Sequence, residues 1–280
     1  MRYSQTNKPP LGSQINWAHP LSKGLVACYL MNEGSGNKIY DLSGNNNTGT
    51  LINGPVWEPG RTGQALKFDG VDDYINVPDN DSFSFTNGTN DLPFSVSLWE
   101  RRTSSQGTGF FGKYLDAAPF NGEWSCSVLA ANTYYFQLID DNPQVRIKIT
   151  SSLTGALNQW NHVVFTYDGS GDEPGLDVYV NGVKDTSPTR NEENDYVKMT
   201  NYSAPLNIGA ILRESGLYSS YFNGKLDDVR IYNRALSARE VAQLYQSPYA
   251  MFEQTPSWMK YVSTVSGNRR RRILISGVYR

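Results

Sequence analysis

The chain has 280 residues, which suits one large domain with extensions or at most two small domains. Its net charge is −2, so the chain as a whole does not have the character of a nucleic-acid-binding protein. It contains 18 Tyr, 11 Phe, 6 Trp and 25 Gly. Aromatic residues favour half-buried strands and Gly favours turns, so the composition indicates an all-β sandwich or barrel.

Residues 1–22 contain three prolines and no periodic apolar pattern, which predicts an extended arm. A free tail is equally compatible with this composition. Ile15 and Trp17 are apolar enough to need a docking surface, which favours an ordered arm. The segment has no apolar core of a signal peptide, and the chain has no apolar run of 18 residues, so neither a signal peptide nor a transmembrane helix is predicted.

Strand signals begin at residue 25. The apolar run 25–31 is expected of a strand covered on both faces, whereas residues 94–99, 145–149 and 176–182 alternate with period two, as strands with one inward face do. The pair Asn181-Gly182 predicts a type I′ hairpin turn. Roughly a dozen strand candidates of this kind precede residue 232, and their spacing is typical of a β-sandwich.

One short helix follows the strands. Ser237 is its predicted N-cap, and Glu240 three residues later completes a capping box. Its apolar stripe consists of Val241, Leu244 and Tyr245. Pro248 ends the helix, which we expect at the edge of the sandwich.

Residues 249–280 form a tail rich in aromatic residues and Arg, with a final strand predicted around Ile273, Ile275 and Val278. The tail is too short to hold its own core, so it should dock on its own sandwich or on a neighbouring subunit. Four arginines at 269–272 lack interleaved stacking aromatics. A solvated face or a contact with an acidic partner protein is therefore favoured over nucleic-acid binding.

The two cysteines, Cys28 and Cys126, lie in apolar, strand-like stretches. Their spacing matches neither a metal knuckle nor a redox motif. One disulfide or none is possible from the sequence, and two buried free thiols acting as small apolar groups are the favoured interpretation.

Seven segments carry a resemblance to a known fold family. In order, they are GLVACYLMNEGSGNKIYDLSGNNNTGTL, GQALKFDGVDDYINV, FSVSLWERR, NQWNHVVFTYDGS, LDVYVNGV, LNIGA and FNGKLDDVRIYNRALSAREVAQLY. This set resembles the laminin-G/concanavalin-A-like superfamily over residues 23–247. The resemblance implies a jelly-roll β-sandwich of two antiparallel sheets, with a domain at 23–248 between the arm and the tail. It is weak for function, because this fold hosts lectins, adhesion modules, enzyme-attached binding domains and viral structural proteins.

An enzyme is not predicted. Glycoside hydrolases of the resembled fold share a strand motif E-x-D-x-E or E-x-D-x-x-E, whose carboxylates flank a glycosidic bond. The sequence has neither form, no nucleophile elbow and no phosphate loop. His162 lies in a strand segment typical of the fold, so its predicted role is structural, and His19 lies in the arm.

One structural calcium ion is the candidate cofactor. In the resembled fold the first and last core strands pair, which would bring Glu33 near Asp227 and Asp228. Glu33, Asp41 and Asp228 could then supply the clustered oxygen ligands that calcium needs. The alternative is that these acids cap turns and accept hydrogen bonds from backbone amides. A second, weaker acidic loop consists of Asp69, Asp72 and Asp73.

Glycan binding would need exposed aromatic rings beside polar groups. The candidates next to predicted loops are Tyr114, Trp124, Tyr218 and Tyr221. The alternative for each is a place in the core or on an ordinary surface.

The leading hypothesis is a non-enzymatic phage virion protein, such as a head decoration, head-fibre or tail-associated subunit that displays the domain toward a host-surface glycan. The opening KPPLGSQINWAHPLSKGLV resembles openings of tailed-phage proteins that carry this domain. Expected partners are other virion proteins and further copies of the chain, with no nucleic acid and no membrane. The alternatives are a lectin module of a secreted or cell-surface protein and a glycosidase on the same fold.

Overall fold

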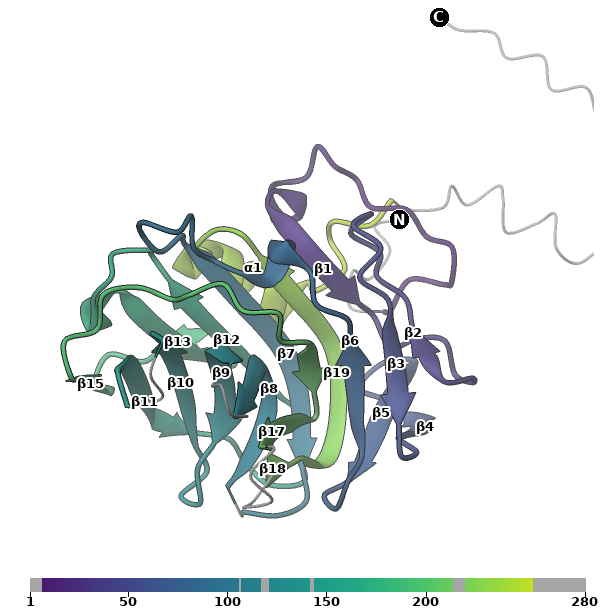
Figure 1. The fold of residues 1–280 in the computed structure, drawn as a ribbon. Coiled ribbons are helices and arrows are strands. Elements are labelled where there is room, and N and C mark those ends of the chain that lie inside the picture. The colour runs from purple at the N-terminus through teal and green to yellow at the C-terminus, as the bar shows by residue number, and fades with distance from the viewer. Residues whose placement is uncertain (1–6, 106, 117–120, 142–143, 214–219, 254–280) are drawn as a thin grey trace, which may run out of the picture.

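The computed structural model describes residues 7–105, 107–116, 121–141, 144–213 and 220–253, which form two β-sheets packed face to face (Figure 1). The eight-stranded sheet has the order β14 (Val183–Lys184), β13 (Leu176–Val180), β12 (Asn161–Tyr167), β7 (Phe94–Arg102), β19 (Asn223–Tyr232), β5 (Gln64–Asp69) and β4 (Val56–Pro59), with β1 (Leu25–Tyr29) paired to β19.

The eleven-stranded sheet has the order β15 (Thr189–Glu193), β11 (Arg146–Thr154), β10 (Thr133–Ile139), β9 (Asn121–Val128), β8 (Thr108–Asp116), β16 (Leu206–Ile208), β6 (Tyr74–Val77), β3 (Gly49–Ile52) and β2 (Lys38–Ile39). The strand β17 (Ala210–Arg213) pairs with β8 and with β18 (Ser220–Tyr221). Among the described strands, β17 and β8 form the one parallel pair. The predicted all-β jelly-roll sandwich is confirmed.

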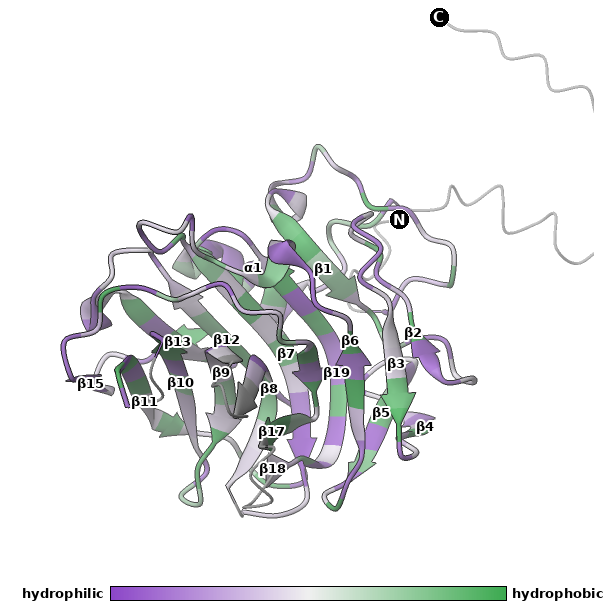
Figure 2. Cartoon of the chain, in the orientation of Figure 1, coloured by the Kyte–Doolittle hydropathy of each residue, from purple (hydrophilic) through white to green (hydrophobic). Residues whose placement is uncertain are grey.

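The main core lies between the sheets and follows from the alternation of apolar residues along the strands. On β7, Phe94, Val96 and Leu98 point into this core. Phe94 stacks on Phe85 with ring centroids 4.1 Å apart. In Figure 2, hydrophobic and hydrophilic residues alternate along β19 and β5. By contrast, β1 is mostly apolar and all of its residues are buried, as predicted for a strand covered on both faces.

A second apolar cluster covers the outer face of the eight-stranded sheet. It joins Ile15 of the arm, Val164 and Tyr232 of the sheet, Val241 of the helix α1 (Ala238–Gln246) and Phe252. An isolated antiparallel β-bridge between Ile15 and Phe252 joins the arm to the segment that follows α1. The arm thus docks on its own sandwich through Ile15.

Two further local predictions are confirmed. Ser237 caps α1 and forms the capping box with Glu240. Asn181 and Gly182 both have positive φ in the tight turn between β13 and β14, the conformation that Asn-Gly pairs favour. In addition, the described residues include three short 3₁₀ helices in loops: η1 (Pro20–Ser22), η2 (Asp81–Phe83) and η3 (Glu173–Gly175). Within the described residues, no helix has the length and apolar character to cross a bilayer.

Cys28 and Cys126 are buried free thiols, as the favoured interpretation held. Burial raises the pKa of the Cys28 thiol to about 12. The predicted tail strand and the four arginines at 269–272 lie outside the described residues.

Candidate functional site

A row of polar residues and one glycine crosses the whole outer face of the eleven-stranded sheet. From edge to edge, the row is Lys38, Thr50, Asn76, Asn207, Gly112, Ser125, Gln137, Lys148 and Asn191. These residues are cross-strand partners on nine neighbouring strands. On the central strands their chain neighbours, such as Trp124 and Cys126 beside Ser125, belong to the core. Because side chains alternate along a strand, the row faces away from the core.

The centre of the row is buried and internally hydrogen-bonded. Gln137 Nε2 donates to Ser125 Oγ at 2.9 Å, and Asn76 Nδ2 donates to Asn207 Oδ1 at 3.2 Å. Ser125, Gln137 and Asn207 are all buried. The buried Asn207 Nδ2 has no hydrogen-bond partner within the described part of the chain, so one donor in this row is unsatisfied.

The row is more exposed toward β11 and β15, beside Tyr135 of β10. There Tyr135, half-buried on the same face, donates its hydroxyl to Gln137 Oε1 at 2.7 Å. Arg146 Nε lies 2.5 Å from Glu193 Oε2, and Lys148 Nζ contacts the other carboxylate oxygen. The hydrogen bond from Lys148 is the largest cause that lowers the pKa of Glu193. This end of the row therefore combines an aromatic ring, an amide, two cations and a carboxylate that remains ionised.

Among the carboxylates with raised pKa values, Glu100 and Glu123 are both fully buried. Burial raises the pKa of Glu100, which is ion-paired with Arg102 and accepts a hydrogen bond from Tyr134. Burial also raises the pKa of Glu123 to about 7, and Lys113 Nζ lies 2.9 Å from it. Raised pKa values mark catalytic acids in some sites, but buried ion pairs produce them too, and here each carboxylate is enclosed with a cation.

The structure gives other partners to the three carboxylates considered for calcium. Asp228 forms two hydrogen bonds with Arg230, both 2.8 Å long. Asp41 accepts from three backbone amides of its loop and of β1, as in the turn-capping alternative. Glu33 accepts from the Tyr40 amide. The trio is not among the clusters of metal-ligating groups in the described residues, and calcium at these residues stays an untested prediction.

The second acidic loop does bring its members together. Asp69, Asp72 and Asp73 place carboxylate oxygens within 4.8 Å of one another. Asp69 accepts hydrogen bonds from the Val71 and Asp72 amides, and the bond from Val71 is the largest cause that lowers its pKa. These contacts are those of a capped turn between β5 and β6.

Two of the aromatic residues predicted for glycan binding are not exposed, and that prediction is wrong for them. Trp124 is fully buried in the core on β9, and its indole N–H donates to the Phe83 carbonyl. Tyr114 on β8 is 5% exposed and packs in a small apolar cluster. Tyr221 on β18 is half-buried, and Tyr218 lies outside the described residues.

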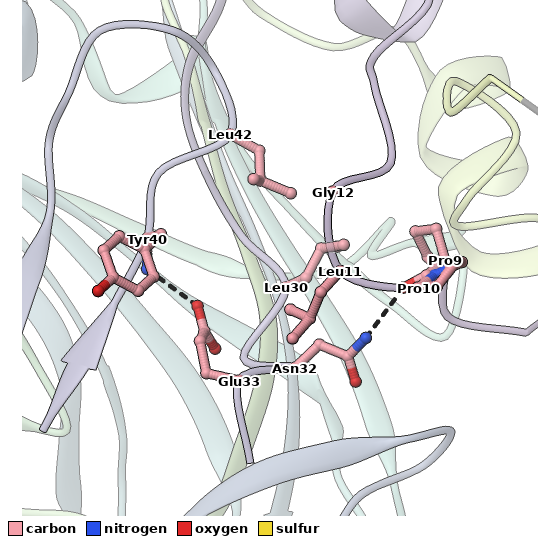
Figure 3. Close-up of a pocket in the computed structure, with 9 residues that line it drawn as sticks. All are labelled: Pro9, Pro10, Leu11, Gly12, Leu30, Asn32, Glu33, Tyr40 and Leu42. Carbon is pink, nitrogen blue, oxygen red and sulfur yellow. Dashed lines mark hydrogen bonds between the residues drawn. The ribbon is translucent and has the colours of Figure 1, made fainter. Parts of the chain in front are cut away.

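A pocket that the sequence did not reveal lies where the arm crosses the end of β1 (Figure 3). Its volume is about 160 Å³, and its lining is Pro9, Pro10, Leu11, Gly12, Leu30, Asn32, Glu33, Tyr40 and Leu42. Tyr40 is 55% exposed and Leu11 is 68% exposed, so both are accessible to a ligand. Because the wall at residues 9–12 depends on the docked arm, local sequence patterns could not show it.

Residues 69–242 match the family described as the concanavalin A-like lectin/glucanases superfamily (Laminin_G_3). The chain belongs to this family. Among curated proteins, none matches the sequence significantly.

Several solved structures have a similar fold. The binding domain of Paraclostridial Mosquitocidal Protein 1 is 22% identical, with a TM-score of 0.60, and the match covers 82% of this chain and 53% of that one. Domain 4 of AbnA, an arabinanase from Geobacillus stearothermophilus, in complex with arabinotriose, is 22% identical, with a TM-score of 0.51, over 79% and 98%. Trypanosoma rangeli sialidase in complex with sialic acid is 19% identical, with a TM-score of 0.56, over 81% and 33%. The chain thus spans about half of the mosquitocidal binding domain and a third of the sialidase. At these identities the likeness concerns the fold, which serves both binding domains and an enzyme.

Proposed function

We propose that this Laminin_G_3 domain is a non-catalytic glycan-recognition domain that binds sugar at the open end of the polar row. The observation that carries the proposal is the group formed by Tyr135, Gln137, Arg146, Lys148 and Glu193 on one face of β10, β11 and β15. Sugar hydroxyls need several donors and acceptors held at fixed spacing, and a sheet face supplies them on a rigid support.

The hydrogen-bond network around Glu193 fixes the donors before a ligand arrives. The carboxylate of Glu193 holds both Arg146 and Lys148, so less side-chain entropy is lost when these cations bind a hydroxyl or a carboxylate of a sugar. The structurally similar domain 4 of AbnA, which is in complex with arabinotriose, supports a sugar ligand for this fold. The missing E-x-D-x-E motif and the enclosure of Glu100 and Glu123 with cations support a non-catalytic role.

A glycan array probed with the full chain tests this proposal. Tyr135→Ala and Lys148→Ala should each weaken binding of any captured glycan about tenfold or more, since each removes a ligand contact worth about 1.4 kcal/mol. Trp17→Ala, which removes an exposed ring from the arm, is the matched control and should bind normally. Failure to bind any glycan, or equal binding by all three variants, would contradict the proposal.

We further propose that the domain is displayed on a phage virion as a homo-oligomer. Support comes from the resemblance of the opening segment to tailed-phage proteins with this domain. Mass spectrometry of purified particles should find the chain in many copies, and light scattering of the full chain should give the mass of an oligomer. A particle preparation without the chain, or a monomeric mass, would contradict the corresponding part of this proposal.

A further inference from the structure

The pocket between the arm and the end of β1 has a chemistry unlike that of the polar row. Five of its nine lining residues are Leu or Pro, and Glu33 is the one charged group in the lining. Its volume of about 160 Å³ lies below the range of about 300–1,000 Å³ found for sites that hold whole drug-sized ligands. The pocket therefore suits a single small group at the end of a ligand.

The Glu33 carboxylate is held in place, but only one of its two oxygens has a hydrogen-bond partner among the described residues. Its Oε1 accepts a 2.9 Å hydrogen bond from the Tyr40 amide. Its Oε2 is buried, and no hydrogen-bond donor in the described part of the chain reaches it. Figure 3 shows the carboxylate beside the Tyr40 ring, with the leucine side chains on its other side. A buried acceptor without a partner is unfavourable, and a ligand that donates a hydrogen bond to Oε2 removes that penalty.

Within the described part of the chain, no hydrogen bond or ion pair joins a cation to this carboxylate. Lys8 directly precedes the lining residues, but its Nζ lies 2.5 Å from Asp227 Oδ1 and its side chain is 1% exposed, so it is engaged elsewhere. A negative charge among apolar walls, next to an exposed aromatic ring, is complementary to a small organic cation. The apolar walls fit methylene groups better than they fit the hydroxyls of a sugar.

We propose that this pocket binds a primary aliphatic ammonium group. The N–H groups donate to Glu33 Oε2, the alkyl chain packs on Leu11, Leu30 and Leu42, and the Tyr40 ring flanks the charge. A quaternary ammonium has the same charge but no N–H group, so it leaves Oε2 unpaired and binds more weakly. A lysine side chain and a free alkylamine carry the same chemistry.

Titration of the full chain, labelled with ¹³C in its leucine methyl groups, tests this proposal. The probes are n-butylammonium, Nα-acetyl-lysine-N-methylamide, butyltrimethylammonium and n-butanol. The first probe should shift the Leu11, Leu30 and Leu42 methyl signals, with a dissociation constant on the order of millimolar for so small a ligand. A response to the lysine derivative but not to butylammonium would assign the pocket to a peptide lysine, and the reverse would assign it to free amines.

Two variants separate the pocket from the rest of the surface. Glu33→Gln should lower the affinity for n-butylammonium about tenfold to a hundredfold, because the lost hydrogen bond is charge-assisted. Glu192→Gln, which neutralises an exposed carboxylate on β15, should leave this affinity unchanged. Tyr40→Ala alters an exposed ring and provides a second test if Glu33→Gln unfolds. Equal binding of n-butanol, or unchanged binding in both Glu33→Gln and Tyr40→Ala, would overturn the proposal.

Discussion

Replacement of Lys8 by Met should destabilise the domain strongly, because it leaves a buried charge without its partner. Lys8 Nζ lies 2.5 Å from Asp227 Oδ1 and 2.5 Å from the Gln64 carbonyl oxygen. Both charged side chains are 1% exposed. Removing one partner of such a pair costs about 3–5 kcal/mol. This loss is a large fraction of the 5–15 kcal/mol that stabilises a typical domain.

The protonation of Asp227 makes this loss depend on pH. Burial raises its pKa to about 7, even though Lys8 acts to lower it. A carboxyl group whose folded-state pKa is raised above its unfolded value near 3.9 destabilises the fold as pH rises through the window between the two values. Without Lys8 the folded-state pKa lies higher still. The cost of Lys8→Met should therefore be smaller at pH 5, where Asp227 is protonated in both proteins, than at pH 8, where Asp227 of the unsubstituted protein is mostly ionised.

Urea unfolding followed by Trp fluorescence at pH 5 and pH 8 measures both effects. The double variant Lys8→Met/Asp227→Leu is the control, because an apolar pair in place of a buried ion pair restores most of the stability. Limited proteolysis within residues 7–22 distinguishes global destabilisation from release of the arm alone. A loss below about 1 kcal/mol at pH 8 with the arm still protected would refute the argument that this ion pair clamps the arm.

Three further predictions concern a buried histidine, a helix cap and the two buried cysteines. Burial lowers the pKa of His162 to about 3, so between pH 3 and 6.5 the unfolded state alone binds the proton. Stability should thus fall by about 1.4 kcal/mol per unit of decreasing pH. This pH dependence of the free energy of unfolding should be lost in His162→Phe but largely kept in His19→Asn. Urea titrations at pH 5 and pH 6.5 measure the difference. Ser237→Ala should cost about 1 kcal/mol by loss of the capping box, measurable as a lower urea midpoint. Cys28 and Cys126 should react with a thiol reagent only after denaturation, and rapid reaction of the native protein would contradict their burial.

Features encoded by neighbouring residues were predictable from the sequence. The alternation in β7, the Asn181-Gly182 turn and the capping box at Ser237 each depend on a few adjacent positions. Trp124 shows where this approach failed. It was expected next to a loop, but pairing of its strand with β8 and β10 places the residue inside a sheet. Tertiary pairing overrode the local signal.

Sites that depend on strand register could not be predicted. The pairing of β1 with β19 was expected and is present, but the register sets Tyr29 opposite Val229. A bulge in β19 then turns Asp228 toward Arg230. The polar row likewise requires the register of nine strands, and the contact of Lys8 with Asp227 joins residues that are 219 positions apart. Single-sequence patterns carry no information at such separations.

The arm connects the stability of the domain to the ammonium pocket. Residues 9–12 form one wall of the pocket, and Lys8 holds the chain directly before them. If Lys8→Met releases the arm in a fraction of molecules, the apparent affinity for n-butylammonium must fall by the same fraction, because only the docked state has a complete pocket. In return, n-butylammonium at about 100 times its dissociation constant should protect the arm of the variant against proteolysis, with a stabilisation of up to about 2.7 kcal/mol. Cleavage of the arm together with unchanged n-butylammonium affinity would show that the pocket does not need the arm. The assignment of Leu11 as a ligand contact would then be wrong, whereas the role of Lys8 as a clamp would stand.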